Sequence, residues 1–166
     1  MADITMGGSP MQTSGELPAV GSKAPDFTIT RDDMADVSLS NYAGKRVILS
    51  LFPSLDTPTC AQSVRSFNER ASSLGDAVVL NVSADLPFAM KRFCGAEGIE
   101  DVEVGSTFRN PEILSDYGTA FASGPLVGLS ARAVVVIDEE GTVLHSQLVP
   151  ELADEPDYDA AIAALG

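Results

Sequence analysis

The chain of 166 residues has no tryptophan, one histidine and two cysteines. Two thiols and one imidazole do not readily supply the four ligands of a zinc site, so neither a metal nor another cofactor is expected. A cysteine hydrolase would need the single histidine, His145, as its base. His145 falls on a predicted strand far along the chain, which makes that alternative weak and a structural role the simpler interpretation.

Basic residues are scarce: 10 Lys and Arg stand against 24 Asp and Glu, and the formal net charge is −14. Nucleic acids and anionic membranes both bind basic surfaces, so neither is expected as a partner. Residues 133–166 contain eight acidic residues and no Lys or Arg. This run is either a solvated face or the partner-selecting surface of a non-enzymatic binding module, and both interpretations stay open.

Long apolar runs are also missing, so no transmembrane helix is expected. The first residues, Met1 to Thr5, lack the basic and apolar regions of a signal peptide, which favours a cytoplasmic location. Cysteines stay reduced in that compartment. A disulfide between the two would therefore be transient and catalytic, not structural.

Apolar residues make up 45% of the chain and charged residues 20%, as in an ordinary globular domain. The hydrophobic pattern predicts the order βαβα, a further short helix and then ββα, which is a three-layer α/β domain with a mixed sheet. The predicted strands are 27–30, 46–52, 77–82, 102–104, 133–137 and 142–147, and the predicted helices start near Pro58, Asp85, Asn110 and Asp157. A small hairpin is predicted over residues 3–13. The chain is thus expected to divide into a β-hairpin extension, 1–15, and a main domain, 16–166.

The stretch 53–60 stands where a predicted strand gives way to a predicted helix. Thr57 is a suitable N-cap residue and Pro58 suits the first helical position, so Cys60 falls in the first turn of the helix. The free amide groups and positive dipole end of a helix start favour a thiolate, which is the nucleophilic form of cysteine. The alternative is that Cys60 is a small buried apolar residue, as free cysteines often are.

The pattern Pro53-x-x-x-Thr57-x-x-Cys60 resembles the active-site signature of the peroxiredoxins, and residues 21–27 resemble the entry segment of that family. Further blocks resemble one subfamily, the bacterial thiol peroxidases, which are atypical 2-Cys peroxiredoxins: Ser83–Phe88, Arg92–Gly95 and Gly124–Leu126. The resemblance runs from about residue 16 to residue 165. It implies a thioredoxin-like fold, with a central mixed β-sheet flanked by helices and an N-terminal β-hairpin.

The resemblance also implies a thioredoxin-dependent peroxidase that reduces hydrogen peroxide and, preferentially, organic (alkyl) hydroperoxides. Cys60 is then the peroxidatic cysteine, and Thr57 and Arg132 orient its sulfur and the peroxide. Pro53 shields the sulfur from water. The sulfenic acid formed on Cys60 condenses with Cys94, the resolving cysteine, to an intramolecular disulfide that thioredoxin reduces. The subfamily further implies a homodimer.

The residue types suit these roles, because a hydroxyl both donates and accepts hydrogen bonds and a guanidinium donates several at fixed geometry. From the residues alone, other roles stay open for each of them. Thr57 would serve as a helix cap in any case. The alternatives are a surface ion pair for Arg132 and a place in the core beside Phe93 for Cys94.

Cys94 lies 34 positions after Cys60, so the two are not a C-x-x-C pair of the thioredoxin kind. It is predicted at the end of a short helix, next to Gly95. A disulfide needs Cα atoms within about 7 Å of each other, and we expect a wider separation in the reduced form, closed by local unwinding. Four further residues are expected to form either an apolar collar for the organic group of the peroxide or plain core: Phe52, Leu55, Phe88 and Phe93.

Overall fold

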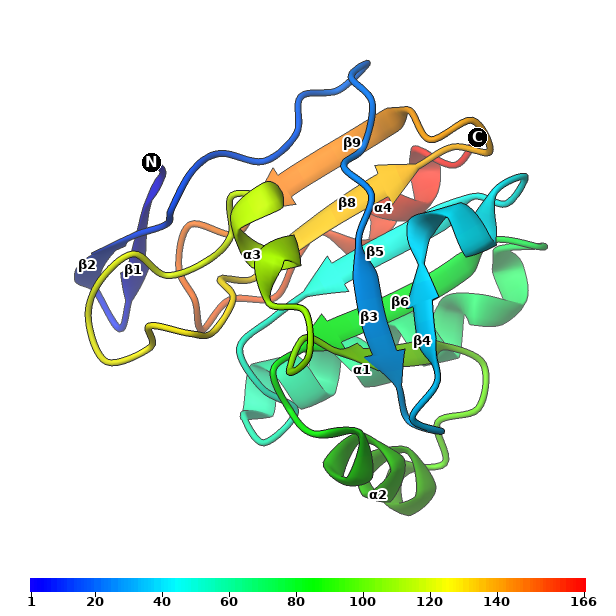
Figure 1. Cartoon of the computed structure of the whole chain (residues 1–166), viewed down its shortest axis with the longest axis horizontal. Coiled ribbons are helices and arrows are strands. Elements are labelled where there is room, and N and C mark those ends of the chain that lie inside the picture. The colour runs from blue at the N-terminus through cyan, green and yellow to red at the C-terminus, as the bar shows by residue number, and fades with distance from the viewer.

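The computed structural model describes residues 1–166, apart from the side chain of Ser72. A two-stranded hairpin lies at one end of a seven-stranded sheet (Figure 1). The strands are β1 (Asp3–Met6), β2 (Ser9–Gln12), β3 (Thr28–Arg31), β4 (Asp36–Ser38), β5 (Val47–Leu51), β6 (Val78–Ser83), β7 (Glu103–Ser106), β8 (Ala133–Ile137) and β9 (Val143–Leu148). The helices are α1 (Pro58–Arg70), α2 (Pro87–Glu97), α3 (Glu112–Asp116) and α4 (Tyr158–Ala163), with short 3₁₀ turns η1 (Leu39–Tyr42) and η2 (Ala71–Ser73).

The large sheet has the strand order β4-β3-β7-β6-β5-β8-β9. Strands β5, β6 and β7 are parallel to their neighbours in this group, whereas β8 pairs antiparallel with β5. All five residues of β5 and of β8 are buried, as expected for strands covered on both faces. The mixed sheet and the helical layers predicted from the hydrophobic pattern are therefore confirmed.

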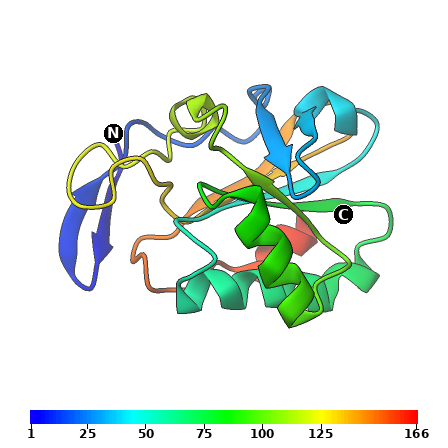
Figure 2. The same cartoon turned by 60° about the horizontal axis from the view of Figure 1, so that its bottom comes forward.

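Helices cover both faces of the sheet, which separates its apolar side chains into different cores. Strand β5 shows the alternation: Val47, Leu49 and Leu51 pack on the side of α3, while Ile48 packs on the side of α1 and α4. Figure 2 shows α1, α2 and α4 together on one side of the sheet, with α3 on the other. A third cluster, which contains Cys60, fills the space between α1 and α2.

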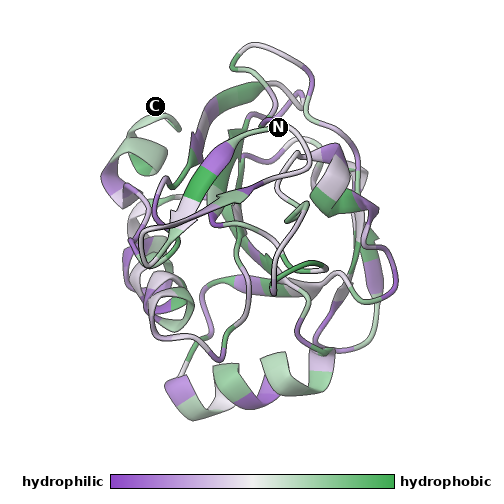
Figure 3. Cartoon of the chain, turned by 90° about the vertical axis from the view of Figure 1, so that its left-hand side faces the viewer, coloured by the Kyte–Doolittle hydropathy of each residue, from purple (hydrophilic) through white to green (hydrophobic). Residues whose placement is uncertain are grey.

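The N-terminal hairpin is present as predicted. Its turn contains Gly7 and Gly8 with φ of +57° and +84°, values that glycine adopts without the steric cost of a side chain. Ile4 and Met11 of the hairpin are buried against Phe121 and neighbouring apolar side chains of the main domain. Figure 3 views the molecule from this end, with the hairpin in front.

Most predicted strands and helices begin within two residues of their observed start, and two differences matter. The edge strand β4 is absent from the prediction, because three residues carry too little periodicity to show one. The predicted stop of the second helix at Gly95 is wrong: α2 continues to Glu97 and ends at Gly98, whose φ of +67° is the left-handed conformation of a helix C-cap. Within the described part of the chain, no helix has the length and apolar character that crossing a membrane requires.

Candidate active site

Cys60 is the third residue of α1 and is fully buried. Strand β5 ends at Leu51, the chain turns through residues 53–57, and α1 begins at Pro58, as predicted from the sequence. The thiol packs in the cluster between α1 and α2, which includes Phe52 and Val64. The surroundings of this sulfur are therefore mostly apolar. In such surroundings a polar group is costly to bury unless it has a hydrogen-bond partner, so each polar contact of the sulfur matters.

Arg132 provides that polar contact. Its Nη2 donates a hydrogen bond to Cys60 Sγ over 3.3 Å, and the residue is only 3% exposed. The pairing of β5 with β8 explains the contact, because the register sets Leu51 opposite Ala133 and so brings the residue before Ala133 to the end of β5. The surface ion pair considered for Arg132 is thus wrong, since the side chain lies in the interior beside the thiol.

The guanidinium of Arg132 is held from its other side by one backbone carbonyl. Both Nε and Nη2 donate to Leu152 O, over 3.2 and 3.0 Å. The remaining nitrogen, Nη1, is buried and has no hydrogen-bond partner among the groups that the structure describes. A buried cation with an unused donor needs an anion or a polar ligand to compensate its desolvation.

Thr57 does not act as the helix cap that the sequence suggests. It occupies the N-cap position with extended backbone angles, but its hydroxyl donates to Ser54 O over 2.9 Å and makes no capping hydrogen bond. The hydroxyl oxygen keeps its lone pairs for another donor. The expectation that Thr57 caps α1 through its side chain is therefore wrong.

Asp85 supports the turn before α1 and was not among the predicted site residues. Its carboxylate accepts hydrogen bonds from Ser54 Oγ and Leu55 N, each over 2.7 Å, and from Ser83 Oγ over 2.6 Å. The sequence places Asp85 at the start of the second helix, whereas the structure turns its side chain toward the neighbouring turn. The sequence did contain a signal that Asp85 belongs to the site, because this residue lies inside the block Ser83–Phe88 that resembles the thiol peroxidases.

A hollow of about 300 Å³ opens beside this constellation. Pro53, Thr57 and Arg132, the three residues expected to contact the substrate, line this hollow together. The rest of its wall is largely apolar and comes from the hairpin, from the loop before β8 and from the segment after β9: Met6, Leu126, Leu129, Leu152 and Ala153. Cys60 is not among the residues that line the hollow.

The apolar wall consists of other residues than those expected. Phe52 and Leu55 lie in the core with Cys60, Phe93 packs partly buried against that core, and Phe88 is 69% exposed. The observed wall side chains are far apart in sequence. Alternation in the hairpin indicates an apolar residue at Met6, but no local pattern shows that it meets the loop around Leu126.

Comparisons with known proteins agree with this geometry. A family model described as Redoxin matches residues 19–162. The chain is 57% identical over 166 residues to proteins named thiol peroxidase in Mycobacterium bovis and in Mycobacterium tuberculosis H37Rv, covering 100% of this chain and 99% of each relative. The chain belongs to the thiol peroxidase family. It is an enzyme that reduces peroxides with a thiol, which excludes the non-enzymatic binding module.

Solved structures confirm the thioredoxin-like fold of this thiol peroxidase. A peroxiredoxin-like protein from Aquifex aeolicus superposes with a TM-score of 0.93 at 36% identity, over 99% of this chain and 96% of that one. A thiol peroxidase from Chromobacterium violaceum superposes with a TM-score of 0.90 at 21% identity, over 98% of this chain and 94% of that one, and shows the fold alone.

The second cysteine of the thiol peroxidase, Cys94, is a free thiol, as is Cys60. Cys94 is partly buried on α2 and packs against the cluster that contains Cys60. Burial raises the pKa of its thiol to about 11, and the nearby carboxylate of Asp32 adds to the shift. Cys94 is therefore protonated, and a poor nucleophile, in this conformation.

Helix α2 is a loosely held element. Only two of its eleven residues, Pro87 and Met90, are buried, and Figure 1 shows the helix at the margin of the molecule. A bidentate ion pair between Arg65 of α1 and Glu97 of α2, with both N–O distances 3.0 Å, fastens its last turn. Sparse burial makes such an element a candidate for local opening.

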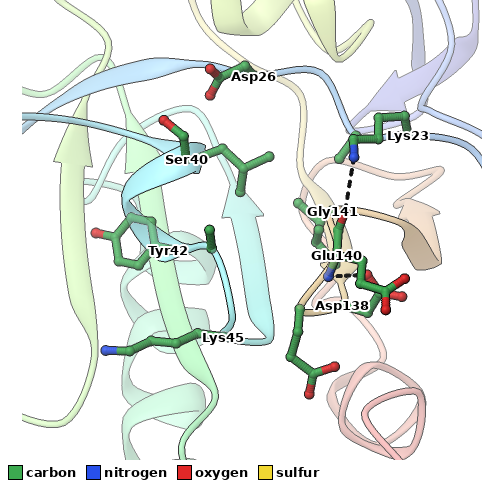
Figure 4. Close-up of a pocket in the computed structure, with 13 residues that line it drawn as sticks. Lys23, Asp26, Ser40, Tyr42, Lys45, Asp138, Glu140 and Gly141 are labelled. Carbon is green, nitrogen blue, oxygen red and sulfur yellow. Dashed lines mark hydrogen bonds between the residues drawn. The ribbon is translucent and has the colours of Figure 1, made fainter.

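A second hollow of about 260 Å³ lies at the opposite end of the sheet, where β5 begins and β8 ends (Figure 4). Two of its charged side chains are engaged by the protein: Lys23 Nζ donates to Glu140 O over 3.0 Å, and Asp138 Oδ1 accepts two backbone N–H groups. Neither cysteine lines this hollow. It plays no part in the chemistry at Cys60.

Proposed function

We propose that Cys60 is the peroxidatic cysteine and that Arg132, Thr57 and Pro53 form the peroxide site around it. The contact of 3.3 Å between Arg132 Nη2 and Cys60 Sγ carries this proposal. A guanidinium beside a sulfur stabilises the thiolate, which is the only nucleophilic form of the thiol. The unpartnered Nη1 is available to a peroxide oxygen, and the Thr57 hydroxyl supplies a further polar contact in the same hollow.

In the first step, the Cys60 thiolate attacks the terminal oxygen of R–O–O–H. A sulfur–oxygen bond forms, the O–O bond breaks, and the departing alkoxide takes a proton to leave as an alcohol. Sulfur is oxidised to a sulfenic acid and the peroxide is reduced. Arg132 faces the oxygen on which negative charge develops, so its donors stabilise the transition state. Because Cys60 is fully buried, the attack requires a small opening of the turn 53–57.

In the second step, we propose that the Cys94 thiol condenses with the sulfenic acid, forming an S–S bond and releasing water. The high pKa of buried Cys94 and the sparse burial of α2 support local unwinding of this helix before the sulfurs meet. A thioredoxin dithiol then reduces the disulfide and is itself oxidised. We propose a cytoplasmic location, in which thioredoxin is available as that reductant. From the family resemblance we also propose a homodimer.

The apolar wall of the hollow supports a preference for alkyl hydroperoxides over hydrogen peroxide. Met6, Leu126 and Leu129 line it beside the polar groups of Thr57 and Arg132. An alkyl chain placed against this wall is removed from water, and burial stabilises it by about 25 cal/mol per Å² of apolar surface. Hydrogen peroxide has no such surface to bury.

Steady-state turnover tests the proposed function. Peroxide consumption is measured with thioredoxin, its reductase and NADPH for the wild type and for the Cys60→Ser and Cys94→Ser variants. Both variants should lose turnover, and a sulfenic acid should be trapped on Cys60 in the Cys94→Ser variant only. Full turnover by Cys60→Ser would refute the assignment of Cys60. Full turnover by Cys94→Ser would refute the intramolecular disulfide.

A further inference from the structure

The segment that follows β9 contacts Arg132, which is the hydrogen-bond partner of Cys60 Sγ, and Thr59, which precedes Cys60 in the chain. Leu152 O accepts the two hydrogen bonds from Arg132 that hold the guanidinium in place. The next residue, Ala153, accepts a hydrogen bond from Thr59 Oγ1 over 2.9 Å, in the first turn of α1 beside Cys60. The position of this short segment therefore sets the position of Arg132 relative to the sulfur.

Glu151 fastens this segment to the N-terminal hairpin. Its Oε1 accepts hydrogen bonds from Gly8 N over 2.9 Å and from Thr5 Oγ1 over 3.0 Å. Its Oε2 accepts from Ala153 N over 2.9 Å, which closes a tight turn around Leu152. Hydrogen bonds from these backbone amides lower the pKa of Glu151 to about 2, so the carboxylate is ionised throughout the neutral range.

Backbone hydrogen bonds on either side of Glu151 also join this segment to the N-terminal hairpin. Thr5 N donates to Pro150 O and Leu152 N donates to Thr5 O, each over 2.8 Å, as in a short parallel β-bridge. The following hairpin residue, Met6, lines the hollow beside Arg132. The carboxylate of Glu151 and this backbone bridge together join the wall of the hollow to the carbonyl that orients the guanidinium.

We infer that Glu151 is a positioning residue for the peroxidase reaction. By tying the turn of the hairpin to Ala153, it fixes Leu152 O and so holds Arg132 against Cys60 Sγ. The inference rests on the proposed function of Cys60 and Arg132. Glu151 contacts neither the sulfur nor the hollow, and acts only through these neighbours.

Three variants test the inference, each made in the Cys94→Ser background so that one thiol is followed. Glu151→Ala removes every side-chain contact, Glu151→Gln replaces one acceptor oxygen by an amide donor, and Thr5→Val removes a single hydroxyl. Glu100→Gln, at an exposed acid between α2 and β7, is the matched control. Two quantities are measured: the peroxide rate constant of Cys60, and the pH profile of its alkylation by iodoacetamide.

Glu151→Ala should slow the peroxide reaction about ten- to a hundredfold, the loss typical of a reacting group displaced by about 1 Å. The alkylation profile of Cys60 in Glu151→Ala should move to higher pH. Glu151→Gln and Thr5→Val should change both the rate constant and the profile in the same direction by smaller amounts. Glu100→Gln should change neither quantity. A lowered unfolding temperature with an unmoved alkylation profile in Glu151→Gln and Thr5→Val would overturn the inference. Alkylation needs no peroxide, so a wild type that fails to reduce peroxides refutes the proposed function, while the alkylation profiles still decide whether Glu151 holds Arg132 against Cys60.

Discussion

Arg132 Nη2 lies 3.3 Å from Cys60 Sγ, although 72 positions separate the two residues in the chain. The antiparallel register of β5 with β8 creates this contact, because it sets Leu51 opposite Ala133. The contact joins a helix start, which offers partial positive charge, to a full positive charge in an apolar cluster.

Replacing Arg132 by lysine should reduce the rate of peroxide reduction about a hundredfold. An ammonium group keeps the positive charge but lacks the planar fork that contacts Leu152 O and Cys60 Sγ together. Stopped-flow measurement of the reaction of Cys60 with peroxide gives the rate directly. A rate for Arg132→Lys within twofold of the wild type would show that charge alone is sufficient.

Replacing Leu126 by alanine should change substrate preference more than catalysis. The shortened side chain removes apolar surface from the wall of the hollow, so KM for cumene hydroperoxide should rise about tenfold. KM for hydrogen peroxide should stay unchanged, because that substrate has no apolar group. Val127→Ala, at the exposed neighbouring residue, is the control. Equal changes in both KM values would contradict an alkyl-binding wall.

The thiol of Cys94 should react slowly with alkylating reagents at neutral pH in the Cys60→Ser variant. Burial and Asp32 raise its pKa from 9.0 to about 11, so folding favours the protonated form. The stabilisation linked to this shift is present below pH 9 and is lost as the pH rises toward 11. The alkylation rate should reach half its maximum near pH 11 in native protein and near pH 9 in urea. Identical midpoints in the two conditions would contradict the burial of Cys94.

Replacing Asp85 by asparagine should loosen the turn that carries Pro53 and Thr57. The substitution puts an amide donor against one of three donors, Ser54 Oγ, Ser83 Oγ or Leu55 N. We expect the free energy of unfolding to fall by about 1–3 kcal/mol, together with a slower peroxide reaction. Urea denaturation and stopped-flow kinetics measure the two effects. An unaltered peroxide rate in a destabilised variant would limit Asp85 to a structural role.

The strands, the helices and the place of Cys60 were predictable because their signals are local. Apolar runs mark the buried strands, and Pro58 marks the start of α1, which is sufficient to place Cys60 in the first turn of that helix. The role proposed for Arg132 came from the family resemblance, because its contact with Cys60 depends on strand register across the sheet. No local pattern encodes that register.

Residues that act through tertiary contacts could not be found from local sequence patterns. Glu151 stands in an acidic run that is consistent with a solvated face, yet its carboxylate accepts hydrogen bonds from the hairpin. Thr57 is of a residue type that caps helices, but its hydroxyl donates a hydrogen bond to Ser54 O and makes no capping hydrogen bond. Met6 and Leu126 meet only because the hairpin packs on the loop before β8.

The most direct test of the central claim is the rate constant of the Cys94→Ser variant with cumene hydroperoxide at pH 7, measured by stopped flow, with the product trapped by a reagent specific for sulfenic acids. If Arg132 holds Cys60 as a reactive thiolate, the reaction should be about a thousandfold faster than that of free cysteine, with the sulfenic acid on Cys60. A rate no faster than that of free cysteine would contradict the account.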